Sequence, residues 1–370
     1  MTRFSKLYKE TVLPAGLLSS VIIGAGMFAL PFVFEAAGFA VGVVYLIIFS
    51  AVFTGIHWMY SEVIRYTEGQ HRFVGYAEIY LKRWGFWGSI FTTALGFILT
   101  LTAYLVLAKG FLELIYPSLT DSWALYLFWV AGSMAIIISL RRLERLEFLI
   151  ALAIGVIILI LFGFGVSMRG GAPPLFISNN LFLPYGVVLF ALGGRAAISS
   201  LWNYYERKKI STAKIKKAII LGTVTPAALY LVFTLAVFWL SGGVVSADAL
   251  SGLVLLPRHI LVAVGALGLF ALWTSYFFLG VEVRDIFRYD FKLGLYPALL
   301  GVTILPIALY LSGLSNFIRI IGVVGGVFGA MESIMVVLMY NRVRRKRSFF
   351  GIAIILVFAV GIIYQLLWSG

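Results

Sequence analysis

The chain of 370 residues lacks cysteine altogether and contains only three histidines, His57, His71 and His259. The absence of cysteine excludes disulfide bonds, thiolate metal sites and cysteine nucleophiles. Three scattered histidines leave little material for an imidazole cluster, so a metalloenzyme is not expected. The sequence also has no phosphate-binding loop, nucleophile elbow, zinc-binding helix or carboxylate pair. These absences argue against an enzyme.

Charged residues are also scarce, at 12% of the chain, whereas 62% of residues are hydrophobic. Such a composition cannot cover a soluble surface, so it indicates an all-α polytopic membrane protein. The first apolar run is too long for a signal peptide and further runs follow, so we interpret it as a span. The eleven predicted transmembrane helices lie near 11–38, 41–64, 87–112, 122–140, 147–168, 184–204, 216–240, 258–281, 293–312, 317–340 and 349–368. Short connectors join them, which predicts one transmembrane domain over 1–370.

The basic residues are distributed unevenly between the two sides of the predicted bundle. Most of the 29 Lys and Arg residues lie before the first span and in every second connector. The positive-inside rule then predicts a cytoplasmic N-terminus, and a C-terminus outside the plasma (inner) membrane. The connector 65–86 is interpreted as an amphipathic helix on the inner surface. Because the net charge of +14 is spread over short loops, nucleic-acid binding is not expected.

The first predicted span is interrupted at residues 19–31, S-S-V-I-I-G-A-G-M-F-A-L-P. Gly24 and Gly26 each lower helix stability by roughly 1 kcal/mol relative to alanine, and Pro31 removes a backbone donor. In lipid, an unwound segment persists only where it lines a polar cavity, and there its free carbonyl and N–H groups suit a ligand with ammonium and carboxylate groups. The alternative is a packing face, because glycine is common at contacts between transmembrane helices.

A second interruption follows in the sixth span, where the pair Gly193–Gly194 precedes Arg195 near the middle of the membrane. The two interrupted spans are five helices apart. If residues 11–168 and 184–340 are two repeats of five spans, the second enters from the opposite side and the breaks meet at the centre. The helix 349–368 then stands outside the repeats.

Four segments carry a resemblance to a known family. They are G-A-G-M-F-A-L-P-F-V-F-E-A-A-G at 24–38, F-A-L-G-G-R-A-A-I-S-S-L-W-N-Y-Y at 190–205, K-I-K-K-A-I-I-L-G-T at 214–223 followed by Tyr230, and W-T-S-Y-F-F-L-G-V-E-V-R-D at 273–285. In order and spacing they resemble the amino acid/auxin permeases and the bacterial aromatic amino acid permeases of the amino acid–polyamine–organocation superfamily. The resemblance implies the five-plus-five inverted-repeat (LeuT-like) transporter fold with broken helices 1 and 6.

The same resemblance implies a secondary transporter that moves an amino acid, aromatic or hydrophobic, by alternating access coupled to Na⁺ or H⁺. By position, the N–H groups from Gly24 to Met27 would hold the substrate carboxylate, and carbonyls from Phe190 to Leu192 would hold the ammonium group. The implied substrate-binding residues are Gly24, Ala25, Gly26, Met27, Tyr104, Phe190, Ala191, Leu192, Gly193 and Arg195.

A sodium site is implied between helices 1 and 8. The hydroxyls of Thr274 and Ser275, with the carbonyls of Ser20 and Ile23, resemble the family's sodium ligands and form an oxygen cage suited to a hard cation. The alternative is that both hydroxyls simply bond to the preceding helical turn. No other cofactor is expected.

Two charged residues inside spans need an explanation. Relatives often have His where Arg195 stands and Pro where Ser199 stands, so this part of the site differs. A charge near mid-membrane costs at least about 2.5 kcal/mol, so Arg195 should face the cavity and have a partner. It either holds the substrate carboxylate or replaces a coupling cation. Since arginine stays protonated, Glu332 is the first candidate for proton coupling, unless it pairs with a cytoplasmic arginine.

Three further features complete the hypothesis. Arg3 and Lys6 precede the first span, and Asp285 and Asp290 follow the eighth on the same side, which suggests an ion-pair gate. The glycines in G-V-V-G-G-V-F-G at 322–329 predict close helix packing. An amino-acid-sensing receptor of the same fold, like those of germination, is the alternative function, although no added signalling domain is present. A membrane-embedded transferase would need an acidic or histidine cluster at one interface, which the sequence lacks.

Overall fold

A computed structural model describes residues 6–69, 71–119, 121–138, 144–168, 173–346 and 348–368. Every regular element in these ranges is helical. Eight of the helices are long and apolar enough to cross a membrane, and a bent pair, Tyr8–Ile22 with Ala25–Ala37, qualifies together. Two shorter apolar helices, Trp123–Ile138 and Leu295–Leu311, bring the described segments to the eleven expected positions.

The spans follow one another along the chain, and several consist of more than one helical segment. They are η1 (Tyr8–Val12), α2 (Leu13–Ile22), η2 (Ala25–Ala29) and α3 (Leu30–Ala37); α4 (Phe39–Arg65); α5 (Phe73–Ile115); α6 (Asp121–Ile138); α7 (Glu144–Met168); α8 (Pro184–Ala191) and α9 (Arg195–Arg207); α10 (Ile215–Leu240); α11 (Arg258–Asp285) and η5 (Ile286–Asp290); α12 (Leu295–Leu311); α13 (Phe317–Val323), η6 (Val324–Gly329) and α14 (Ala330–Arg344); and α15 (Phe349–Trp368).

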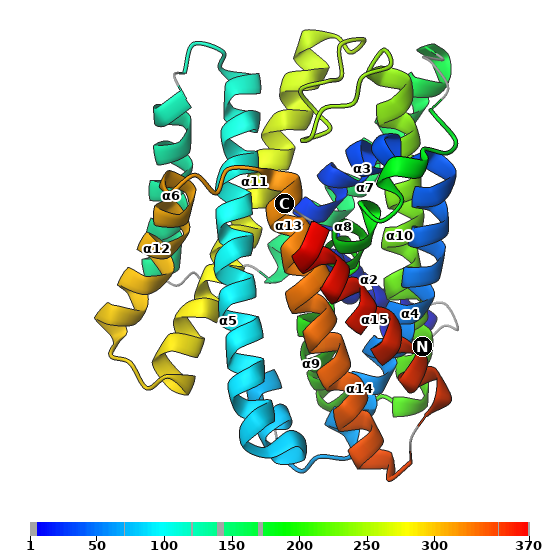
Figure 1. The fold of residues 1–370 in the computed structure, drawn as a ribbon, viewed down its shortest axis with the longest axis vertical. Helices are drawn as coiled ribbons and strands as arrows, with labels where there is room; N and C mark the ends of the chain where they lie inside the picture. The colour runs from blue at the N-terminus through cyan, green and yellow to red at the C-terminus, as the bar shows by residue number, and fades with distance from the viewer. Residues whose placement is uncertain are drawn as a thin grey trace.

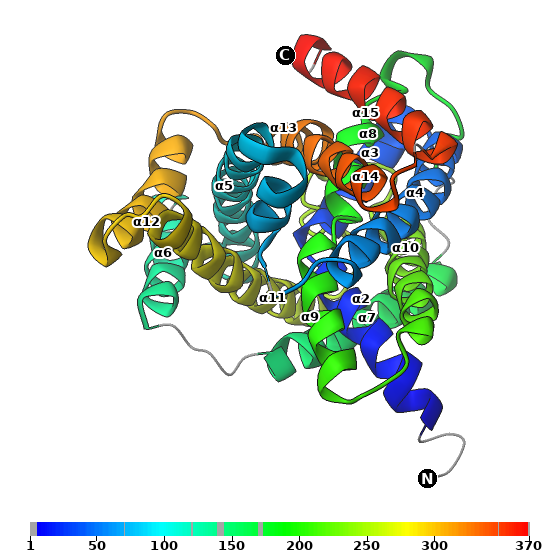
Figure 2. The same ribbon diagram turned by 90° about the horizontal axis from the view of Figure 1, so that it is seen from below.

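The broken helices lie inside the bundle. In Figures 1 and 2, α2, α8 and α9 are flanked by α4, α7 and α10 on one side and by α5 and α11 on the other. Helices α6 and α12 stand furthest from α10, and α15 packs on the outside against α14 (Figure 2). The interior therefore contains the two interrupted spans, surrounded by continuous ones.

The connector predicted to be an amphipathic helix is helical from Phe73 onward and runs into the third span. Lys82 interrupts it with a φ of 60° and a ψ of −150°, so α5 consists of two helices meeting at that residue. Trp84, directly after the break, is 91% exposed. An exposed tryptophan beside two basic residues is typical of a membrane interface, which fits the predicted surface position of this helix.

Helix α10 is joined closely to α2 at a proline. Pro226 has no N–H group, so the carbonyl of Gly222, four residues earlier, lacks its helical donor. Ser19 of α2 donates its Oγ hydrogen to this carbonyl at 3.1 Å. A Cβ atom on Gly222 would lie 2.8 Å from the Cβ of Leu18, so only glycine permits this approach.

The glycines of the tenth span pack closely, as predicted. A Cβ atom on Gly186 of α8 would lie 2.1 Å from the Gly322 carbonyl oxygen, and one on Gly325 would lie 2.0 Å from that of Gly186. Residues Val324–Gly329 form a π-helix, which the sequence pattern did not predict. This wide turn faces α8 and brings the tenth span against the broken sixth span.

Candidate functional site

The first span breaks where the glycines predict it. Helix α2 ends at Ile22, Ile23 is extended with a ψ of 96°, and Gly24 has a φ of −148° and a ψ of −158°. The two halves are bent by 55°. Pro31 differs from expectation, because it lies in the first turn of α3 and starts that helix. The break therefore comes from the residues around Gly24.

The sixth span breaks between Ala191 and Arg195, and the two breaks touch. Gly194 precedes α9 with a φ of −141° and a ψ of 13°. A Cβ atom on Gly26 would lie 2.7 Å from the Cα of Ala191 and 3.0 Å from Cδ1 of Phe190. The expected meeting of the two breaks is confirmed, and it depends on the missing side chain of Gly26.

One tyrosine links the ends of both broken helices. The hydroxyl of Tyr230, on α10, donates to the carbonyl of Ile22 at 2.5 Å and shares its hydrogen with the carbonyl of Ala191 at 3.0 Å. These carbonyls end α2 and α8, where the helical donors are missing. Tyr230 is completely buried. Sequence reasoning noted it only as part of the family resemblance.

Replacing Tyr230 with phenylalanine is expected to destabilise the break and weaken substrate binding by about tenfold. The substitution leaves two buried carbonyls without their donor, which costs about 1–3 kcal/mol for such a group. Thermal unfolding and equilibrium binding of labelled amino acid measure the two effects. Tyr185→Phe is the matched control, because its buried hydroxyl has no hydrogen-bond partner in the described ranges. Equal losses in both variants would contradict the proposed role.

A central cavity of about 800 Å³ opens beside the two breaks. Seven of the predicted substrate residues line it: Gly24, Ala25, Gly26, Tyr104, Phe190, Gly193 and Arg195. Met27, Ala191 and Leu192 are buried and do not contribute to its lining. The cavity continues to Arg207 at the end of α9 and to Glu282 on α11. At the other end, Phe28 packs edge-on against Phe111 and Phe233, with ring centroids 5.0 and 5.9 Å apart.

Arg195 and Glu332 form an ion pair on the cavity wall. The Nε and Nη2 atoms of Arg195 both lie 3.0 Å from Oε2 of Glu332, and Thr93 donates its hydroxyl to Oε1 at 2.7 Å. The guanidinium also lies over the Phe73 ring, 3.8 Å from its centroid. Arg195 thus has the partner that its position requires, and that partner is the intramembrane acid that the sequence singled out separately. The side chains are each 15% exposed, and both residues line the cavity.

His57 is a cavity residue to which sequence reasoning assigned no role. Its Nδ1 lies 3.0 Å from the hydroxyl of Thr223, and the residue is 1% exposed. Within the described part of the chain its Nε2 has no hydrogen-bond partner. A Cβ atom on Gly194 would lie 3.3 Å from Cε1 of His57, which places the ring beside the sixth-span break. An ionisable residue in the middle of the second span was the available signal.

Only some of the residues predicted to bind sodium line the cavity. Ser20 and Ser275 line the cavity, whereas Ile23 and Thr274 are buried. Thr274 donates its hydroxyl to the carbonyl of Ala271 at 2.9 Å, which is the helical bonding weighed as the alternative. Hydroxyl and carbonyl oxygens are ligands that suit a hard cation, so these residues fit Na⁺ chemically. The sodium site stays a prediction.

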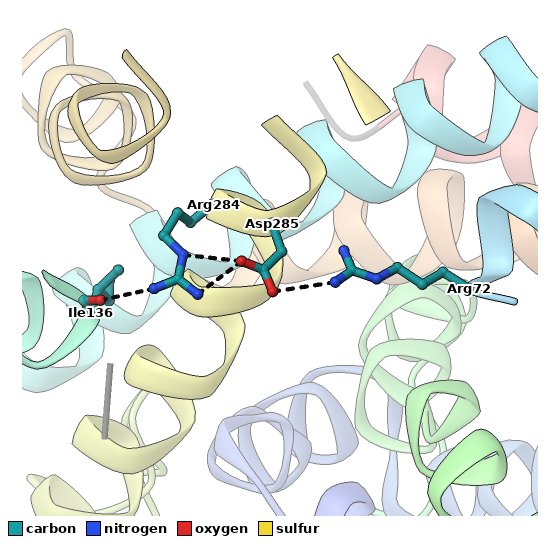
Figure 3. Close-up of polar contacts among 4 residues, drawn as sticks. All are labelled: Arg72, Ile136, Arg284 and Asp285. Carbon is teal, nitrogen blue, oxygen red and sulfur yellow. Dashed lines mark hydrogen bonds and ion pairs between the residues drawn. The ribbon is translucent and has the colours of Figure 1, made fainter. Parts of the chain in front are cut away.

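The predicted ion-pair gate has different partners in this structure. Asp285 accepts from Arg72 at 3.2 Å and from Arg284 at 2.8 and 3.0 Å, and Arg284 also donates to the Ile136 carbonyl at 3.4 Å (Figure 3). Lys6 is exposed, and Arg3 lies outside the described residues.

Arg72 is the observed partner of Asp285 from another helix, and it ties the start of α5 to the end of α11. A buried oxygen of Asp290 lacks a hydrogen-bond partner within the described ranges. The pairing of Asp285 with Arg3 stays a prediction.

Solved structures with a similar fold include transporters. MhsT in complex with L-phenylalanine has a TM-score of 0.68 and 16% identity over 96% of this chain and 98% of that chain. A manganese transporter from Eremococcus coleocola has a TM-score of 0.61 and 13% identity over 99% of this chain and 88% of that chain. Mhp1, a nucleobase-cation-symport-1 family transporter in a closed conformation, has a TM-score of 0.61 and 13% identity over 96% of this chain and 90% of that chain. These likenesses establish the fold alone. Two broken helices that meet beside a central cavity, in this LeuT fold, are the arrangement typical of secondary transporters.

A family model narrows the class. The model of the tryptophan/tyrosine permease family matches residues 9–368. The chain belongs to this family, so it is a transmembrane amino acid permease and not an enzyme. Comparison with curated protein sequences gives no match.

Proposed function

We propose that the protein carries an aromatic amino acid across the plasma membrane by alternating access, driven by Na⁺ or H⁺. The observation that supports this most directly is the contact of two helix breaks beside an 800 Å³ cavity. Aromatic side chains contribute to its lining, including Phe53, Phe97, Tyr104, Phe190 and Phe328. Such rings suit an aromatic substrate side chain. The complex of MhsT with L-phenylalanine is consistent with this choice.

The backbone at the breaks suits the charged ends of the substrate. The first backbone hydrogen bond of η2 runs from Met27 N to the Gly24 carbonyl at 3.3 Å. The N–H groups of Ala25 and Gly26 come before it in the chain, at the start of the helix, where N–H groups have no partner within the helix. They are the donors we propose for the substrate carboxylate. In this proposal the Phe190 carbonyl, at the end of α8 beside the cavity, faces the ammonium group, whereas the Ala191 carbonyl accepts from Tyr230.

The distribution of basic residues supports an orientation with the N-terminus in the cytoplasm and the C-terminus outside. In that orientation the end of α9, where Arg207 lines the cavity, is cytoplasmic. The cavity then opens inward, and the rings of Phe28, Phe111 and Phe233 close the outer side. The conformation is the inward-facing one of the transport cycle in this proposal. The repeats 11–168 and 184–340 supply its two interrupted helices.

Transport is tested by reconstitution into liposomes and counterflow of labelled tryptophan, tyrosine and phenylalanine. A carrier exchanges internal and external substrate without any ion gradient. An amino acid sensor of the same fold binds its ligand and gives no counterflow. If no amino acid gives counterflow although binding is preserved, the transporter hypothesis is wrong and the sensor hypothesis is supported.

The coupling ion is tested separately with substitutions at the two candidate sites. If Na⁺ is coupled, Ser275→Ala should raise the Na⁺ concentration for half-maximal uptake by about tenfold, because one hydroxyl ligand is lost. Ser251→Ala, in an exposed loop, is the control. If uptake is indifferent to Na⁺ and follows the pH gradient, the sodium site is wrong. Glu332 is then the proposed proton carrier, and Glu332→Gln should keep exchange and lose proton-driven accumulation.

A further inference from the structure

A second pocket lies away from the central cavity, at the end of the bundle where α4 and α14 finish and α10 begins. Its volume is about 390 Å³. It is lined by Trp58, Ser61, Glu62, Arg65, Tyr66, Trp202, Ala213, Ile215, Lys216 and Arg344. Four helices contribute to it, so its shape depends on how α4, α9, α10 and α14 are packed.

Cationic side chains converge on this pocket from three of the helices. Arg65 comes from α4, Lys216 from α10 and Arg344 from α14. Among the described residues Glu62 is the only acid in the lining, and it contacts Arg65 at 3.4 Å and Arg344 at 3.9 Å. One carboxylate against three cations leaves the pocket positive. Such convergence costs energy through like-charge repulsion unless an anion joins it.

Aromatic rings hold the cations in place. Lys216 Nζ lies 5.8 Å from the centroid of the Trp58 ring, and Arg344 donates to the Tyr66 hydroxyl at 3.1 Å. At the pocket floor, Trp202 Nε1 donates to Ser61 Oγ at 2.9 Å. Tryptophan and tyrosine combined with Lys and Arg are typical of the level of lipid headgroups.

The apolar helix α15 packs against α4 and α14 near the pocket. Phe350 contacts the α4 backbone, because a Cβ atom on Gly55 would lie 2.7 Å from its Cε1. Gly55 stands about one turn before Trp58. Phe349 is 88% exposed. An apolar helix with exposed phenylalanines next to a cationic pocket allows acyl chains to follow the helix while a headgroup enters the pocket.

We propose that this pocket binds the phosphate of an anionic phospholipid headgroup. Lys216 and Arg344 bind the phosphate oxygens, and Trp58 and Tyr66 pack against the glycerol. The bound lipid joins the start of α10 to the ends of α4 and α14. These helices carry Tyr230, His57 and Glu332, so lipid occupancy acts on the elements of the central cavity.

Native mass spectrometry of the full chain in detergent, titrated with phosphatidylglycerol, tests the proposal. The variant Lys216→Gln with Arg344→Gln should bind this lipid about thirtyfold more weakly. The matched control, Lys208→Gln with Lys346→Gln, loses the same charge from exposed residues at the same end and should bind as the parent does. Equal binding by the two variants would overturn the proposal.

Two further probes identify the ligand chemistry. Phosphatidylcholine bound as tightly as phosphatidylglycerol would refute an anion site. Glycerol phosphate bound as tightly as the lipid would mean that a soluble anion, and no lipid, is the ligand. If thermal unfolding shows that the double variant does not fold, Lys216→Gln alone is used, because within the described ranges this exposed side chain contacts the Trp58 ring and forms no ion pair. A loss of at least about fivefold is then expected, and unchanged binding refutes the proposal.

Discussion

Gly26→Leu is expected to abolish amino acid transport, with at least a hundredfold loss of uptake. Even a Cβ atom at this position would lie 2.7 Å from the Cα of Ala191. The obstructing atom belongs to the backbone, so no side-chain rotation relieves the clash. A leucine would separate η2 from α8 and fill the space proposed for the substrate carboxylate. Initial uptake rate and substrate binding in proteoliposomes measure the loss.

The control for this substitution is Gly163→Leu in α7. A Cβ atom on Gly163 has no neighbour within 4 Å in the part of the chain that the structure describes, so the added side chain meets no backbone there. This variant should retain expression and uptake close to those of the parent chain. Undiminished uptake by Gly26→Leu at normal expression would refute the substrate site at the breaks.

Arg195→Ala is expected to lower uptake by at least about a hundredfold. The substitution leaves the Glu332 carboxylate in the cavity wall without its cation, and breaking such a pair costs about 3 kcal/mol or more when it is well buried. Arg195→Lys should rescue poorly, because two guanidinium nitrogens reach Oε2 and the flat group stacks on Phe73. Uptake at several substrate concentrations separates lost affinity from lost turnover.

A double-mutant cycle tests whether the two residues act together. If the pair is the functional unit, Arg195→Ala combined with Glu332→Gln should lose less than the sum of the single changes. Arg319→Ala is the control, since it removes an exposed arginine from α13. Wild-type affinity and ion dependence in Arg195→Ala would reduce Arg195 to a structural charge.

The spans and both breaks could be predicted from sequence because their causes are local. Long apolar runs define the membrane helices, and glycine pairs weaken a helix wherever they occur. Gly24, Gly26 and Gly193 therefore indicated the centre of the site before any contact was known. The assignment of Pro31 to the break was wrong in detail, because a proline is equally suited to the first turn of a new helix.

The partners of the polar side chains could not be predicted, because they depend on helices far apart in the chain. Glu332 is 137 residues from Arg195, and no local pattern joins them. Tyr230 meets two carbonyls from different spans, and His57 reaches the sixth-span break from the second span. Asp285 likewise pairs with Arg72, which no spacing rule distinguishes from Lys6.

The tie between α2 and α10 decides where the first span can bend. Ser19 donates to the Gly222 carbonyl, which lacks a helical donor because of Pro226. The hydroxyl of Tyr230 donates to the Ile22 carbonyl in the last turn of α2. These two hydrogen bonds hold the last turns of α2 against α10. In the proposed transport cycle we therefore expect α2 to move together with α10, and the hinge to be the short extended link at Ile23 and Gly24. A proline in one helix thus helps to determine which residues form the hinge of another.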